Sequence, residues 1–236
     1  MRINLTALKQ SLVGQIQKND VISNNLANIN TIGFKKDRVF FDTLSEKMKD
    51  KPAIRQAVDF SQGQLKQTAN PLDIALSGRG FFVVEAEDGE AYTRTGHLQI
   101  DTDGVLRTAG GQAVLGDGGP IVIIGKNIKP QNITITQSGE IYVDDAFIDK
   151  MRIVDFEYPD EVEKLGNSLF RARNGAQPVE LEEPEVQQGF LEGSNVNPAE
   201  EMIELIEVQR QFESIQRMVR ALDETFNKAA NQVGRY

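Results

Sequence analysis

Two short motifs contain residue types that bind phosphate or calcium in other proteins. Gly78-Arg79-Gly80 is similar to the start of a dinucleotide-binding loop, in which glycines let the backbone approach a pyrophosphate. Val83 occupies the position of the third glycine, and a strand is expected to follow where such a loop needs a helix. Asp101-Thr102-Asp103-Gly104 begins like a calcium loop, but no acidic ligands follow at the required spacing. We therefore reject a dinucleotide site at the first motif and predict a hairpin turn at the second, and we expect no cofactor and no metal.

The other catalytic residue types are too isolated to form an active site. The 236 residues include no cysteine and a single histidine, His97, which has no Gly-x-Ser-x-Gly motif to act on. The carboxylate pair Glu182-Glu183 lies in a polar stretch that offers no apolar surroundings for a general acid. We therefore predict no catalytic residues and no enzymatic activity.

The composition is typical of a folded protein, and it predicts neither a nucleic-acid partner nor a membrane span. Hydrophobic residues make up 39% and charged residues 26% of the sequence, as in globular proteins. The net charge is −9, and the mixed cluster Lys35-Lys36-Asp37-Arg38 is too small for a polyanion site. Apolar runs are too short to span a membrane, and Lys9 and Gln10 interrupt the apolar residues of the N-terminus. We expect no membrane span and no cleaved signal peptide.

The N-terminal residues show spacings of three and four, the pattern of a coiled-coil helix. We call these positions the N-terminal seam: Leu5, Leu8, Leu12, Gln15, Asn19, Ile22, Leu26 and Ile29. Gly33 follows the seam, and because glycine accepts positive φ it is the predicted helix stop.

The C-terminal residues follow the same pattern more regularly. We call these positions the C-terminal seam: Leu205, Val208, Phe212, Ile215, Val219, Leu222, Phe226, Ala229 and Val233. Either Asn195 or Asn197 can cap this helix, and Pro198 suits its first turn. A long C-terminal helix is therefore predicted.

Between the seams, short apolar runs alternate with turn dipeptides such as Asp88-Gly89 and Ser138-Gly139, which join antiparallel strands. Strands are expected over residues 81–84, 92–94, 98–101, 105–107, 121–124, 133–136, 141–143 and 151–156. We predict a discontinuous α+β fold, in which the N- and C-terminal helices pair in a coiled-coil-like bundle and an antiparallel β domain is inserted between them. The predicted parts are a terminal helical domain (1–35 with 198–236), extended connectors (36–75 with 157–197) and the β domain (76–156).

The two seams are longer than one small β domain can cover, so we expect them to contact another molecule. The predicted subunit-interface residues are Leu5, Leu8, Leu12, Ile22, Leu26, Leu205, Val208, Phe212, Ile215, Val219, Leu222 and Phe226. Packing of the same faces against the β domain is the alternative. Two other functions are a coiled-coil adaptor that recruits one partner, and an enzyme dimerised by its helices, which lacks a catalytic cluster.

The end of the N-terminal helix resembles the signature of bacterial flagellar rod and hook proteins. The residues that carry this signature are Ser23, Asn24, Asn25, Leu26, Ala27, Asn28, Thr31, Gly33, Phe34 and Lys35. The resemblance continues, in order, through residues 63–65, 70–75, 78–82, 92–96, 103–106 and 189–198 and into the C-terminal helix. Because it covers nearly the whole chain, the sequence is identified as a member of the flagellar axial protein family.

The resemblance implies a structural subunit that polymerises helically into the basal-body rod, the drive shaft that transmits torque from motor to hook. Its implied partners are copies of itself, other rod and hook proteins, and the flagellar type III export apparatus. The short length and residues 191–198 favour a proximal rod subunit, with a distal rod subunit as the alternative. The implied location is a rod that crosses the periplasm. Phe40 and Leu44 fit the Phe-x-x-x-hydrophobic export element, with a packed connector as the alternative.

Overall fold

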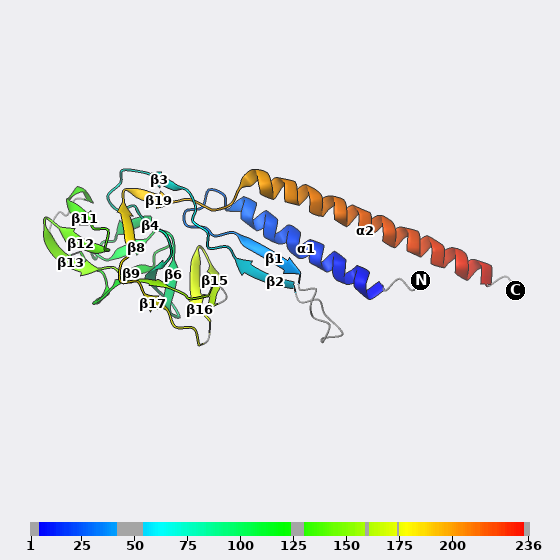
Figure 1. Ribbon diagram of the computed structural model, residues 1–236, viewed down its shortest axis with the longest axis horizontal. Helices are drawn as coiled ribbons and strands as arrows, with labels where there is room; N and C mark the ends of the chain where they lie inside the picture. The colour runs from blue at the N-terminus through cyan, green and yellow to red at the C-terminus, as the bar shows by residue number, and fades with distance from the viewer. Residues whose placement is uncertain (1–4, 42–53, 124–129, 159–160, 174, 234–236) are drawn as a thin grey trace. The chain divides into compact units, whose positions relative to one another are not determined.

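The computed structural model describes residues 1–236 except 1–4, 42–53, 124–129, 159–160, 174 and 234–236, and it leaves the side chains of residues 5–9, 41, 54–55, 226 and 228–233 undescribed. The fold is α+β, as predicted, with two helices and many antiparallel strands (Figure 1). It divides into two compact units. Unit 1 comprises Met1–Ala27, Asp37–Ala57 and Asn197–Tyr236, and unit 2 comprises Asn28–Lys36 and Val58–Val196.

Unit 1 contains both helices and a two-stranded sheet (Figure 1). Helix α1 spans Leu5–Ala27 and helix α2 spans Pro198–Val233. Gln15 bonds to Gln211 and Lys18 to Glu204, so the two helices run antiparallel. Strand β1 (Asp37–Phe41) pairs with β2 (Ile54–Val58) and packs against α1.

Asn197, rather than Asn195, is the cap of α2. Its Oδ1 accepts a hydrogen bond from the backbone N–H of Ala199 at 3.1 Å, and its Nδ2 donates to Glu200 at 3.0 Å. The bond from Ala199 satisfies a backbone donor that is otherwise free in the first turn. The acidic side chains of this turn also interact favourably with the positive end of the helix dipole.

Helix α1 ends at Ala27, so the prediction that Gly33 stops it is wrong. A turn follows instead, in which the N–H of Thr31 donates to the carbonyl of Asn28 at 3.1 Å. Gly33 has φ +67°, and a Cβ there would lie 2.7 Å from the backbone of Arg94. Gly33 is therefore required by a close approach of two backbones within unit 2.

Unit 2 consists of antiparallel sheets. Its strands are β3 (Leu65–Gln67), β4 (Ile74–Ser77), β5 (Phe81–Ala86), β6 (Gly89–Thr93), β7 (Leu98–Ile100), β8 (Leu106–Thr108), β9 (Ala113–Gly116), β10 (Gly119–Pro120), β11 (Ile133–Ile135), β12 (Glu140–Val143), β13 (Ala146–Lys150), β14 (Ile153–Asp155), β15 (Val162–Gly166), β16 (Leu169–Ala172), β17 (Val179–Glu180), β18 (Glu185–Gln188) and β19 (Phe190–Glu192). The largest sheet has the order β15-β16-β6-β5-β9-β8-β7, with β10 on β9 and β14 between β5 and β17. A second sheet has the order β11-β12-β13, and β18-β4 and β19-β3 form two pairs.

The predicted turns are confirmed. Gly89 begins β6, directly after the turn that joins it to β5. Asp101 accepts backbone N–H groups of Asp103 at 2.9 Å and Val105 at 2.8 Å, and its other oxygen accepts Arg107 Nε at 2.6 Å. The carboxylate that began the calcium-like motif thus holds a hairpin turn together.

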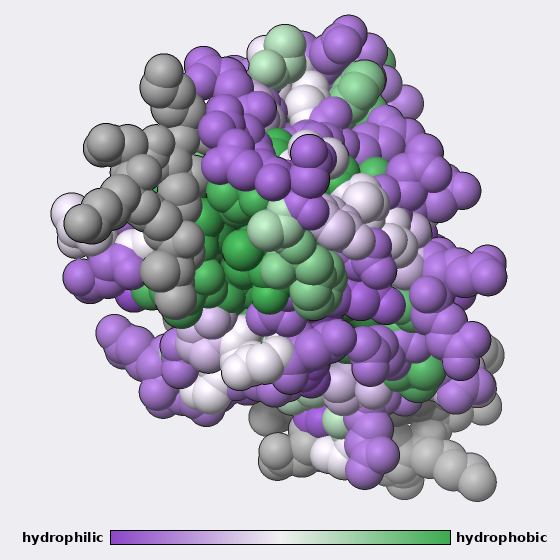
Figure 2. Space-filling view, turned by 90° about the vertical axis from the view of Figure 1, so that its left-hand side faces the viewer, coloured by the Kyte–Doolittle hydropathy of each residue, from purple (hydrophilic) through white to green (hydrophobic). Residues whose placement is uncertain are grey.

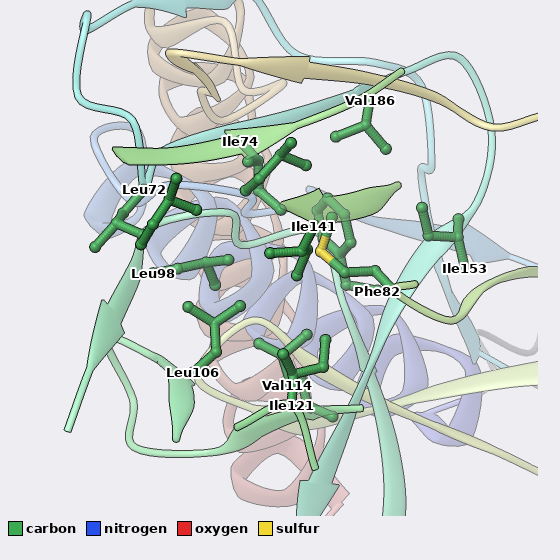
Figure 3. Packing of buried hydrophobic residues seen from close by; sticks show 14 of the residues in the cluster. Leu72, Ile74, Phe82, Leu98, Leu106, Val114, Ile121, Ile141, Ile153 and Val186 are labelled. Atoms are coloured by element: carbon green, nitrogen blue, oxygen red, sulfur yellow. The ribbon is translucent and has the colours of Figure 1, made fainter. Parts of the chain in front are cut away.

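Strand β5 is buried on both faces, which explains its unbroken apolar run. Phe82 and Val84 belong to one core cluster, between the large sheet and strands β4, β11, β12 and β18 (Figure 3). Phe81 and Val83 belong to a second cluster on the other face. There the ring of Phe81 lies 5.6 Å from that of Phe170, centroid to centroid. Side chains alternate across a strand, so β5 joins the two clusters into one folded unit.

The ranges expected as connectors contain strands β1 to β4 and β15 to β19. The pairs β18-β4 and β19-β3 join residues far apart in the sequence. Strands β3, β4, β18 and β19 are short and pair with distant segments, so their local pattern gave no clear period.

Candidate assembly surface

Helices α1 and α2 contact each other within unit 1. Gln15 Nε2 donates to Gln211 Oε1 at 2.7 Å, and Lys18 Nζ lies 3.3 Å from a carboxylate oxygen of Glu204. Most predicted seam residues are half-buried here: Leu12, Leu26, Leu205, Phe212, Ile215, Val219 and Leu222. Ile22 and Val208 are buried, each 2% exposed. Leu5 and Leu8 lie in α1 and Phe226 in α2, but their side chains are outside the described part.

A groove of about 290 Å³ lies along the two helices. Its lining comprises Gln15, Ile16, Asn19, Asp20, Val208, Gln209, Phe212 and Glu213. Ile16 is 50% exposed at this groove, and Gln15 Oε1 is buried there without a hydrogen-bond partner. The contact between α1 and α2 is therefore incompletely packed at this level of the helices.

Both helices also expose apolar side chains outside the seams, which the sequence analysis missed. Met202, Ile203 and Ile206 of α2 are 51–59% exposed and form one patch, because residues three or four positions apart are neighbours on a helix. Met218 on α2 and Val13 on α1 are 47% and 44% exposed. In the sequence, the signal for this patch is the presence of apolar residues at helix positions outside the three-and-four spacing.

Unit 2 exposes apolar side chains as well. Phe147 is 56% and Val179 64% exposed. The face of unit 2 in Figure 2 is mainly hydrophilic around one hydrophobic area. On α2, by contrast, exposed apolar residues recur along one helix, at Met202, Ile203, Ile206 and Met218.

Asn25 joins three elements of unit 1 and is itself 2% exposed. Its Nδ2 donates to the carbonyl of Asp37 at 3.0 Å and to Glu201 Oε2 at 3.1 Å, and its Oδ1 accepts the N–H of Asp37 at 3.0 Å. This signature residue therefore ties α1 to β1 and α2 within one chain.

Other signature residues form local contacts. Ser23 Oγ donates to Asn19 Oδ1 at 3.4 Å, and Thr31 Oγ1 donates to Asn28 Oδ1 at 3.0 Å. Asn24 and Ala27 are exposed on α1. Phe34 is buried in unit 2, with Lys164 Nζ 4.2 Å from its ring centroid.

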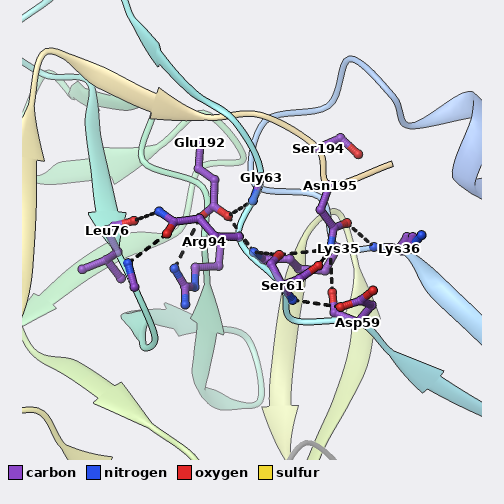
Figure 4. A network of polar contacts seen from close by, with 12 residues as sticks. Lys35, Lys36, Asp59, Ser61, Gly63, Leu76, Arg94, Glu192, Ser194 and Asn195 are labelled. Atoms are coloured by element: carbon purple, nitrogen blue, oxygen red, sulfur yellow. Dashed lines mark hydrogen bonds and ion pairs between the residues drawn. The ribbon is translucent and has the colours of Figure 1, made fainter. Parts of the chain in front are cut away.

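Lys35, Arg94 and Glu192 form a buried ion cluster in unit 2 (Figure 4). Glu192 Oε1 accepts hydrogen bonds from Lys35 Nζ at 2.6 Å and the N–H of Gly63 at 2.8 Å, and Oε2 lies 3.3 Å from Arg94 Nη1. Lys35 Nζ also donates to the carbonyl of Ser61 at 2.8 Å. Burial lowers the pKa of Lys35 and of Arg94, and the Glu192 carboxylate opposes both shifts.

Asn195 extends this ion cluster with neutral hydrogen bonds. Its Oδ1 accepts the N–H of Lys36 at 2.8 Å, and its Nδ2 donates to the carbonyls of Asp59 at 2.8 Å and Ser61 at 3.0 Å (Figure 4). From spacing alone, Asn195 was one of two predicted helix caps, and Lys35 had no predicted ion-pair partner. A carboxylate at a sequence separation of 157 residues leaves no local signal.

The single histidine and the carboxylates are the possible metal ligands among the described residues. His97 Nδ1 lies 2.7 Å from Asp73 Oδ1, and no three metal-ligating side chains converge in this part of the chain. Neither helix, over its described residues, has the apolar length that a membrane crossing needs. Phe40 is 52% exposed in β1, and Leu44 lies outside the described residues.

Three protein-family profiles match successive parts of the chain. Residues 2–35 match "Flagella basal body rod protein", 75–143 match "Flagellar hook protein FlgE/F/G D1 domain", and 187–233 match "Flagellar basal body rod FlgEFG protein C-terminal". These ranges include α1, the centre of unit 2 and α2.

Curated relatives match over almost their whole length. The flagellar basal-body rod protein FlgF of Caulobacter vibrioides is 31% identical, over 92% of this chain and 91% of its own. FlgF of Salmonella typhimurium is 34% identical over 89% of each chain, and the rod protein FlgG of Bacillus subtilis is 31% identical over 91% of this chain and 92% of its own. The chain belongs to the FlgF/FlgG family of flagellar basal-body rod proteins.

Proposed function

We propose that this structural subunit of the flagellar rod polymerises helically, and that the polymer transmits torque from the motor to the hook. Subunits related by a helical operator meet through different surfaces, so their contacts propagate instead of closing. The observation that carries the proposal is the exposed apolar surface of α1 and α2. An apolar surface of this kind is typical of a protein-protein contact.

In this proposal the two seams pair α1 with α2 in a coiled-coil-like manner and also face neighbouring subunits. The half-buried seam residues support this double role, since one partner helix leaves part of each side chain exposed. The patch of Met202, Ile203 and Ile206 then contacts a helix of another subunit. Copies of this chain and other rod and hook proteins are the partners that fit.

The terminal helices, with residues 1–35 and 198–236, would form the inner tube. Residues 36–75 and 157–197 would surround it, and the β domain of residues 76–156 would lie outside. Unit 1 supports this arrangement because it brings both helices together in one compact unit, with the β1-β2 pair beside them. The role is mechanical and requires no enzymatic activity.

A proximal, FlgF-type position fits the alignments better than a distal, FlgG-type one. The FlgF alignments extend over 229 and 230 residues and the FlgG alignment over 246, although all cover similar shares of this chain. The FlgG alignment therefore contains more inserted positions.

We also infer export by the flagellar type III apparatus, without signal cleavage, into a rod that crosses the periplasm. The exposed Phe40 supports an export element that includes Leu44. Replacing Phe40 with Asp should reduce the amount of exported protein while cellular levels persist, as measured by immunoblotting of the two fractions. Unchanged export would assign Phe40 to packing instead.

The seam is tested by Phe212→Asp and Val219→Asp in motile cells. An unpaired charge in an apolar contact costs at least several kcal/mol, so rods should not form and cells should not swim. Ser214→Asp is the matched control, because Ser214 is exposed on the same helix outside the seam and the groove. Normal swimming of both seam variants would contradict the proposal.

A further inference from the structure

Two segments that lie apart in the sequence run side by side within unit 2. Residues 33–36 follow α1, and residues 192–195 precede α2. The N–H of Gly33 donates to the carbonyl of Glu192 at 2.8 Å, and the N–H of Lys36 donates to Asn195 Oδ1 at 2.8 Å. The stretch of unit 2 that joins α1 to β1 is thus bonded to the segment that leads to α2.

A third segment, residues 59–63, closes against this pair. Asn195 donates to the carbonyls of Asp59 and Ser61, and Lys35 donates to the carbonyl of Ser61. A Cβ on Gly63 would lie 2.0 Å from the carbonyl oxygen of Gly193, so the backbones are packed without space for a side chain. The three segments can therefore shift only together.

The charges of the ion cluster hold the three segments in this arrangement. The side chains of Lys35, Arg94 and Glu192 are at most 3% exposed, and one carboxylate serves two cations. Both carboxylate oxygens are in use, and Oε1 also accepts the N–H of Gly63. Any displacement of a segment would leave a charge buried without its partner, a large penalty in a protein interior. Because the desolvation of buried ions offsets much of their attraction, such a cluster adds little net stability, whereas removing one partner is strongly destabilising.

We propose that Lys35, Arg94, Glu192 and Asn195 act as a clasp that fixes the spacing of the segments leading to α1 and α2. These are positioning residues, because they hold the connecting segments through contacts within the single chain. The spacing is a property of the single chain. Only its consequence, correct placement of the helices for assembly, rests on the proposed rod function.

The test measures the spacing directly in the full-length protein. Because the chain contains no cysteine, Asn30→Cys and Ser194→Cys provide a unique pair of spin-label sites, the first in the turn before residues 33–36 and the second within residues 192–195. The label-to-label distance distribution is measured by pulsed electron paramagnetic resonance. It is compared in the labelled parent chain, in Glu192→Gln and in Asn195→Ala. Glu90→Gln is the control, since it removes the exposed 2.7 Å ion pair with Arg152 in the same unit.

We expect one narrow distribution in the parent chain and in Glu90→Gln. Glu192→Gln should broaden it, because two cations lose their anion. Asn195→Ala should broaden the distance distribution without leaving a buried charge. If Glu192→Gln does not fold, the result for Asn195→Ala alone tests the clasp. Broadening with the strand signal of unit 2 retained in circular dichroism supports the clasp. A narrow, unchanged distribution in Asn195→Ala would overturn it. Because this measurement uses monomers, its failure is distinct from failure of rod assembly in cells.

Discussion

At the scale of single residues, Lys35 is buried and held by two hydrogen bonds. Its amine is buried between Glu192 and the carbonyl of Ser61, and burial lowers its pKa from the value of 10.5 that it has when exposed. At a pH between the pKa of Lys35 in the folded chain and its pKa in the unfolded chain, this amine is protonated more often in the unfolded chain. The stability contribution of Lys35 therefore rises with pH across this window.

This predicts that the parent chain gains stability relative to Lys35→Met as the pH rises toward about 10.5. Denaturant unfolding of both proteins at several pH values measures the difference. Methionine preserves much of the side-chain volume but does not titrate. The pH dependence of the difference in stability therefore reports the titration of Lys35. A difference that stays constant from neutral to alkaline pH would exclude a lowered pKa for Lys35.

Gly63 tests the close packing of the clasp. In Gly63→Ala, the new methyl group would meet the carbonyl oxygen of Gly193, and we expect a loss of about 1–3 kcal/mol in unfolding free energy. Gly118→Ala is the control, because its Cβ would meet only a side-chain oxygen at 3.6 Å and its φ is not positive. Equal stability of the two variants in denaturant titrations would argue against a tight contact.

The residues of the clasp show what a single sequence leaves open. Lys35 and Glu192 are ordinary charged residues in their local surroundings, and only the pairing of β19 with β3 places Glu192 beside the residues after α1. Asn195 and Asn197 are equivalent as caps by spacing alone. Their roles separate because Asn195 is occupied by Lys36 and Asp59.

At the scale of elements, the helix caps and turns follow local rules. Asn197 caps α2 through the N–H of Ala199, so Asn197→Ala should reduce the helix contribution to stability by about 1 kcal/mol. Thermal unfolding followed by the helix signal in circular dichroism measures this loss. Asn197→Asp should retain most of the stability because its carboxylate also accepts the bond. A loss of similar size in Asn197→Asp would indicate a role other than capping.

The elements that were predicted well are those with a short-range signal. The C-terminal helix and the central hairpins follow from spacing and turn dipeptides, and α2 and β5 to β8 lie where they were expected. The end of α1 was missed because Gly33 matched a helix stop, whereas its positive φ serves the approach to Arg94. Tertiary contacts determined the use of that glycine.

At the scale of the whole molecule, unit 2 has its own core and includes no residue of α2. A chain that ends at residue 197 should therefore keep a folded β domain while losing assembly. The strand signal in circular dichroism and the sedimentation behaviour of the truncated protein test this. Loss of the strand signal together with α2 would show that unit 2 depends on the helix.

The central claim is that exposed apolar residues of the helices join subunits into a rod. Ile206→Asp tests it most directly, because Ile206 is 51% exposed and its change should leave the monomer folded. Basal bodies purified from cells that carry only this variant are examined by electron microscopy, with Ser214→Asp as the control and the melting temperature of each monomer as a check. The account predicts absent or truncated rods for Ile206→Asp and normal rods for Ser214→Asp. Full-length rods in Ile206→Asp cells would contradict it.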